Sequence, residues 1–119
     1  MSDTNAQSLR QLKIKTGVVK RLFKEESTYK QEVVDQTKVV EKLKADGADG
    51  ADIRAAERVL RDSEMMVPRT RTQLEEAYQT LEDLVGALKS ESSIAESQEF
   101  TDAFSQLQQV ETAWKSDGN

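Results

Sequence analysis

A seven-residue repeat in the second half of the chain constrains the fold more than any other feature. Six aliphatic residues occupy successive positions of this repeat: Ile53, Leu60, Val67, Leu74, Leu81 and Leu88. Five small or apolar residues occupy the companion positions: Ala56, Ser63, Thr70, Ala77 and Leu84. On a helix, this spacing places all eleven side chains on one stripe that faces a partner helix in left-handed supercoiled packing. The repeat therefore predicts a helix over about 52–89.

Two clusters of turn-forming residues separate this helix from its neighbours. The first covers 45–52 and contains two Gly and three Asp, of which Asp52 or its rival Asp49 is the expected N-cap. The second contains Ser93 followed by Glu96, which matches the Ser-x-x-Glu capping box. Three helices are therefore predicted, at about 8–45, 52–89 and 93–115.

The first of these helices repeats less regularly than the second. One frame of aliphatic residues is interrupted by Glu26, and its companion frame is interrupted by Lys15 and Gln36. The first frame consists of Leu12, Val19, Val33 and Val40, and the companion frame of Leu22, Tyr29 and Leu43. Four further aliphatic residues lie off this stripe: Ile14, Val18, Val34 and Val39. The predicted helix is thus amphipathic, with apolar groups on more than one face.

The composition fits a protein with a thin core. Hydrophobic residues make up 36% of the 119 residues and charged residues 33%, against roughly 45–50% and 25% in typical globular domains. We therefore predict an all-α fold: an elongated, antiparallel three-helix bundle with coiled-coil-like packing and flexible termini, forming a single domain over 1–119. The second helix is expected to kink near Pro68, which lacks a backbone donor and clashes with the preceding turn.

The sequence argues against an enzyme and against a bound cofactor or metal. Cys and His are absent, which excludes a thiolate nucleophile, an imidazole base and a Cys/His zinc site. There is no glycine-rich phosphate loop and no Gly-x-Ser-x-Gly motif. The chain also shows no secretory signal and no apolar run of the roughly 18–20 residues that a membrane span needs. We therefore expect a cytoplasmic protein.

Charge is distributed unevenly along the chain. Residues 1–24 carry a net charge of +5, and residues 75–119 carry −8. Such asymmetry can steer an acidic partner to one end, or two helices of opposite charge can attract each other within the bundle. Both interpretations stay open. Nucleic-acid and membrane-surface binding are disfavoured, because the whole chain is acidic and the basic helix lacks a continuous apolar face.

Three features outside the regular pattern are candidates for a protein-binding surface. Val67 lies on the stripe, so Met65 points away from it, where a flexible methionine side chain suits an irregular partner surface. Alternatively, a kink at Pro68 turns Met65 and Met66 into the core. Gly17 is expected to allow the close approach of the third helix or of a partner, with helix packing the favoured explanation. Trp114, the only tryptophan, is expected to cap the core.

Two motifs resemble the tubulin-folding cofactor A family, also called tubulin-specific chaperone A. The first is Lys-Ile-Lys-Thr-Gly-Val-Val-Lys-Arg-Leu-Phe-Lys-Glu at 13–25, and the second combines Ser-x-Met-Met-Val-Pro at 63–68 with Leu-Glu-x-Ala-Tyr-x-x-Leu at 74–81. The resemblance covers about 9–112. It implies a three-helix chaperone, located in the cytoplasm in association with the cytoskeleton, that binds quasi-native β-tubulin released from the chaperonin and passes it on for heterodimer assembly.

The resemblance and the charge pattern together give a set of candidate binding residues. These are Lys13, Lys15, Val18, Lys20, Arg21, Lys24, Met65, Met66, Pro68, Arg69 and Tyr78. The expected partner is β-tubulin, with later tubulin-folding cofactors as further candidates, and the protein is expected to be a monomer or a homodimer. The alternative is a structural or adaptor coiled coil that self-associates through its second helix.

Overall fold

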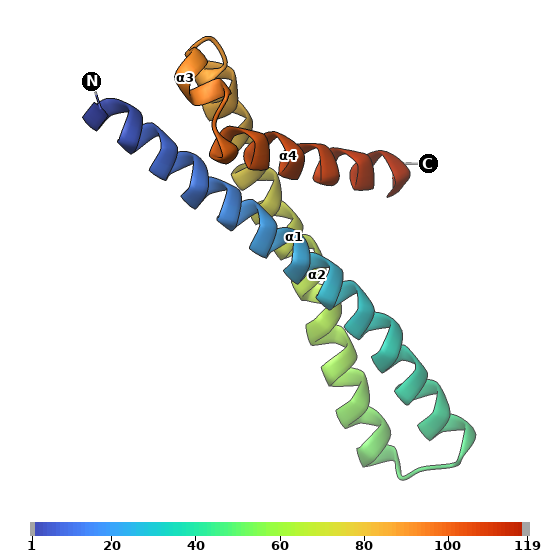
Figure 1. Cartoon of the computed structure of the whole chain (residues 1–119). Coiled ribbons are helices and arrows are strands. Elements are labelled where there is room, and N and C mark those ends of the chain that lie inside the picture. Colours follow the sequence, from blue (N-terminus) through green and yellow to red (C-terminus); the bar gives the residue numbers. More distant parts are fainter. Residues whose placement is uncertain (1, 118–119) are drawn as a thin grey trace. The chain divides into compact units, whose positions relative to one another are not determined.

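The computed structural model describes residues 2–117 and is helical, with no strand among them (Figure 1). Its elements are α1 (Ser2–Ala45), α2 (Gly50–Leu88), α3 (Ser92–Ala95) and α4 (Gln98–Asp117). The predicted all-α class is confirmed, and α1 begins six residues earlier than the sequence indicated. Of the termini expected to be flexible, residues 1 and 118–119 lie outside the described part of the chain.

The chain divides into two compact units. The first, which we call the core unit, comprises Met1–Phe23 and Gln73–Asn119; the second, which we call the hairpin unit, comprises Lys24–Thr72. α1 and α2 each contribute residues to both units, whereas α3 and α4 belong to the core unit alone.

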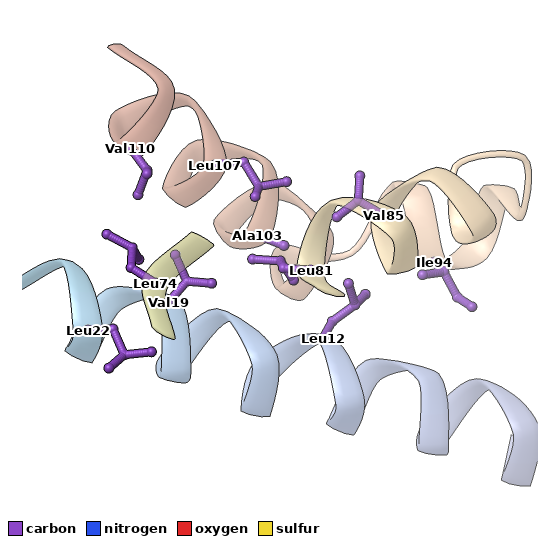
Figure 2. Packing of buried hydrophobic residues seen from close by; sticks show 10 residues of the cluster. All are labelled: Leu12, Val19, Leu22, Leu74, Leu81, Val85, Ile94, Ala103, Leu107 and Val110. Carbon is purple, nitrogen blue, oxygen red and sulfur yellow. The ribbon is translucent and has the colours of Figure 1, made fainter. Parts of the chain in front are cut away.

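The core unit contains a hydrophobic cluster to which all four helices contribute. Figure 2 shows the side chains of α4 pointing toward those of α2 and α1. The cluster consists of Leu12, Val19, Leu22, Leu74, Leu81, Val85, Ile94, Ala103, Leu107 and Val110. Because these side chains are at most 8% exposed, their removal from water is the main driving force for folding of this unit.

The hairpin unit is formed by the end of α1, a tight turn and the start of α2. Gly47 adopts a φ of +70°, a left-handed conformation that glycine tolerates without steric cost. The amide of Ala48 donates to the Leu43 carbonyl at 3.0 Å, and that of Gly47 donates to the Lys44 carbonyl at 3.2 Å, which together form a Schellman motif. The Asp49 carbonyl then accepts the first helical bonds of α2, so Asp49 holds the N-cap position rather than Asp52.

Every position of the α2 stripe is buried or half-buried, as the seven-residue repeat predicts. In the core unit Leu74 and Leu81 are 0% exposed. In the hairpin unit Ala56 and Thr70 are buried, whereas Leu60 and its aliphatic neighbours on the stripe are half-buried. α2 continues through Pro68 without ending, because the missing donor affects a single hydrogen bond on an exposed side of the helix. The kink at Pro68 stays a prediction.

The residues that interrupt the α1 stripe have polar partners across the hairpin. The side chain of Glu26 is only 5% exposed, and its Oε2 accepts a hydrogen bond from Arg71 Nη1 at 3.1 Å. The amide of Gln36 donates to the Ala56 carbonyl at 3.1 Å. These pairs require α1 and α2 to run antiparallel in one register, since a shift along the stripe would leave a buried charge without its partner.

The C-terminal region differs from the predicted single helix with a capping box at Ser93 and Glu96. Ser93 lies inside the short α3, where its hydroxyl accepts a hydrogen bond from the Asn5 amide at 3.2 Å. The cap is formed by Ser97, whose Oγ accepts from the Phe100 amide at 3.1 Å and donates to the Ile94 carbonyl at 2.6 Å. Ile94 is 2% exposed, so a turn after α3 both buries this side chain and redirects the chain into α4.

The expectation that Gly17 allows close packing of another helix of this chain is wrong, and the approach of a partner stays a prediction. Gly17 is exposed, and a Cβ placed on it would have no neighbouring atom within 4 Å. No helix of the described chain therefore approaches this position closely. A glycine here costs about 1 kcal/mol of helix stability relative to alanine, and no contact in the described structure accounts for it.

Replacement of two stripe leucines tests the difference in packing between the units. Leu81→Ala should lower the free energy of unfolding by about 2–5 kcal/mol, because it removes a fully buried side chain and leaves a cavity. Leu60→Ala, at an equivalent position of the repeat but half-buried, should cost about 1–2 kcal/mol. Urea denaturation followed by circular dichroism measures the free energy of unfolding of both variants. Equal losses would contradict the deeper burial of Leu81 relative to Leu60.

The ion pair between Glu26 and Arg71 predicts an asymmetric response to mutation. Arg71→Leu leaves the carboxylate of Glu26 in the stripe with only Lys30, at 4.0 Å, and should cost about 2–4 kcal/mol. Glu26→Leu should cost less than about 1 kcal/mol, because the Arg71 side chain is 30% exposed and can reach water, while leucine suits the stripe. Chemical denaturation of both variants checks this order, and the reverse order would show that Glu26 is not buried.

Candidate functional site

The described residues contain no group of three acidic residues arranged to hold a metal ion, and none of their helices is long and apolar enough to cross a membrane. The candidate functional features considered below are exposed side chains on the surfaces of the helices. Six large hydrophobic side chains are exposed on these surfaces: Ile14, Val34, Val39, Val59, Met65 and Phe104.

The basic face of α1 is the first candidate surface and lies in the core unit. Lys13, Lys20 and Arg21 are exposed there, and Lys15 is half-buried. Residues seven apart lie on one line along a helix, so Lys13 aligns with Lys20 and Ile14 aligns with Arg21 on two neighbouring lines. Ile14 is 48% exposed, which gives this positively charged face an apolar contact point.

Part of this positive charge lies near acidic residues of the same unit. Lys13 and Thr16 of α1 line a shallow pocket together with Glu99 and Asp102 of α4. Opposite charges that line the same pocket attract each other. The acidic lining of this pocket is consistent with attraction within the core unit at Lys13, whereas Lys20 and Arg21 are exposed, and the steering of a partner stays a prediction.

Two of the predicted binding residues contribute to the packing of the core unit. Val18 and Tyr78 are half-buried and pack against the hydrophobic cluster. The Tyr78 ring contacts Trp114 with 4.9 Å between ring centroids, and Trp114 also packs against the cluster, as expected for a residue that caps the core. Burial raises the pKa of Tyr78, and the negative charges of Glu82 and Glu111 raise it further. Its hydroxyl therefore stays neutral at physiological pH.

The methionine-proline motif lies in the hairpin unit. Met65 is 70% exposed, the highest value among the large hydrophobic residues that the structure describes, whereas Met66 is half-buried. The alternative in which both methionines enter the core is therefore wrong for Met65. Pro68 and Arg69 are exposed beside them, and Lys24, at the start of the unit, is also exposed. An exposed, flexible thioether next to a cation is suited to contact an irregular protein surface.

A groove in the hairpin unit is a further candidate surface that was not predicted. It is lined by Glu32, Asp35, Gln36, Val39, Val59 and Ser63. Val39 and Val59 each immediately precede an aliphatic residue of the stripe, at Val40 and Leu60. That repeated offset of one residue is the sequence signal that could have identified the groove, since it places both valines on one edge of the stripe.

Comparison with known proteins gives a consistent result across sequence and structure. The family model described as tubulin binding cofactor A matches residues 7–107. The chain is 41% identical to the chicken (Gallus gallus) tubulin-specific chaperone A over 102 residues, which cover 86% of this chain and 92% of that protein.

Two solved structures are similar to this one. The crystal structure of tubulin folding cofactor A from Arabidopsis thaliana matches with a TM-score of 0.78 and 34% identity, covering 90% of this chain and 98% of that chain. The structure of human tubulin chaperone cofactor A matches with a TM-score of 0.71 and 36% identity, covering 87% and 98%. Together with the family match over most of its length, these similarities show that the chain belongs to the tubulin binding cofactor A family.

Proposed function

We propose that this protein is a tubulin-folding cofactor that binds quasi-native β-tubulin after its release from the cytosolic chaperonin, stabilises it, and passes it on for assembly of the αβ heterodimer. The observation that carries the proposal is membership of the tubulin binding cofactor A family over residues 7–107. The absence of Cys and His from the chain supports a binding role without catalysis. A cytosolic location and later tubulin-folding cofactors as further partners belong to the same proposal.

The described surfaces support different roles for basic and apolar residues during binding. Exposed basic residues such as Lys20 and Arg21 attract an acidic partner at long range, which mainly raises the association rate. Exposed apolar residues such as Met65 exclude water at the contact, which mainly lowers the dissociation rate. The cofactor thus holds its client through the surfaces of helices, with no need for nucleotide hydrolysis.

Self-association is the alternative function, and the burial of the stripe bears on it. A coiled coil that dimerises through α2 would need its stripe covered by a second chain. The stripe positions from Ile53 to Val67 are at least half-buried by the hairpin unit, and those from Leu74 to Leu88 by the core unit. A second chain is therefore not required to remove these side chains from water, which favours the tubulin-binding proposal.

A pull-down tests the identity of the client. The immobilised chain should retain β-tubulin from a cell extract in preference to α-tubulin, as detected with isoform-specific antibodies. Retention of neither tubulin, together with a concentration-dependent melting temperature, would instead support the self-associating alternative.

Charge reversal tests the steering role of the basic face. Lys20→Glu with Arg21→Glu should lower the association rate for β-tubulin by about threefold to tenfold at low salt, and the difference should shrink at high salt because screening shortens the range of the attraction. Stopped-flow fluorescence measures the rate.

The matched control reverses two exposed basic residues of the hairpin unit, Lys38→Glu with Arg58→Glu, and so changes the net charge by the same amount. An equal fall in rate for both variants would show that net charge, rather than the basic face of α1, determines encounter.

A further inference from the structure

The two long edges of the hairpin unit differ in how their charges are paired. On one edge lie Lys44, Glu57 and Arg71, which directly follow companion positions of the stripes. Lys44 pairs with Glu57 at 3.3 Å, and Arg71 pairs with the stripe residue Glu26 at 3.1 Å. These ion pairs join α1 to α2 and close this edge. The opposite edge carries the groove.

The groove edge combines exposed apolar side chains with unneutralised acidic ones. Val39 and Val59, one from each helix, are 45% and 51% exposed. Glu32 and Asp35 are exposed on the α1 side, and neither forms an ion pair with any residue of the described chain; Asp35 accepts only a hydrogen bond from the Gln31 amide at 2.9 Å. No basic residue lines the groove. It is therefore an open groove in which two valines lie beside unpaired carboxylates.

This chemistry specifies the kind of segment that the groove can hold. Valines contributed by two antiparallel helices form a track into which a third helix can insert apolar side chains spaced three and four residues apart. The core unit shows the same principle, because there α4 covers α1 and α2 with Ala103, Leu107 and Val110. Carboxylates on the rim favour a helix whose flanks carry Lys or Arg and disfavour an acidic one.

We propose that the groove formed by Glu32, Asp35, Gln36, Val39, Val59 and Ser63 binds a helical segment of the tubulin client that has an apolar face flanked by basic residues. The inference rests on the proposed function and adds a contact surface of opposite charge to the basic face of α1. The client is then held by two chemically different surfaces, which discriminates against proteins that satisfy only one of them.

Charge reversal at the rim tests the proposal. Glu32→Lys with Asp35→Lys should weaken the affinity for tubulin about tenfold at low salt, since two attractive contacts become repulsive. The control Glu41→Lys with Glu64→Lys makes the same charge change at exposed sites of the same unit outside the groove, and should alter affinity less than about threefold. Circular dichroism should show unchanged helicity in both variants.

Site-specific cross-linking identifies the occupant. A photo-reactive amino acid at Val59 should cross-link to a helical tubulin segment rich in Lys or Arg. The same group at the exposed neighbour Arg58 should not form this cross-link, because position 58 points about 100° away around the helix. Mass spectrometry of the cross-linked peptide identifies the segment. Cross-links from Val59 to an acidic tubulin segment or to a second copy of this chain would overturn the proposal.

The outcomes separate this inference from the proposed function. If the unmodified chain retains tubulin but the rim variant binds as tightly as its control, the groove is not the contact surface and the chaperone function stands. If the unmodified chain retains no tubulin, the proposed function and the assignment of the groove both fail.

Discussion

Burial of the α2 stripe is the interaction on which the rest of the structure depends. Eleven positions at heptad spacing face other helices, and every one of them is at least half-buried. Because the hydrophobic effect is proportional to the apolar area removed from water, a chain with so few apolar residues depends on regular stripes that neighbouring helices can cover. The remaining faces are then free to carry charge, which accounts for a helical protein that is one-third charged residues.

The two units satisfy this constraint in different ways. In the core unit, α3 and α4 complete a cluster whose members are at most 8% exposed. The hairpin unit has only two helices, and of its aliphatic side chains and alanines only Val40 and Ala56 are buried. Its stripe instead includes the polar residues Glu26 and Gln36, whose partners fix the antiparallel register. Specific polar contacts in the hairpin unit thus complement its thin apolar core.

Membership of the tubulin binding cofactor A family directs attention to the helix surfaces, since the stripe residues are occupied in packing. The surfaces of the two units differ in character: the core unit presents basic residues of α1, and the hairpin unit presents Met65 and an acidic groove with exposed valines. Exposed apolar side chains that lie together at a groove, as Val39 and Val59 do, are candidates for contact with a partner protein.

The sequence by itself predicted the helical class, the turn between α1 and α2 and the inward direction of the stripe, because heptad spacing and a glycine-aspartate turn are local signals. The motifs also identified the family. It did not predict the division of the C-terminal region, since the cap at Ser97 rather than Ser93 follows from the burial of Ile94 in a core built by distant helices. Only the tertiary structure paired Glu26 with Arg71 and brought Val39 beside Val59, because which edge of a helix is covered depends on residues far away along the chain.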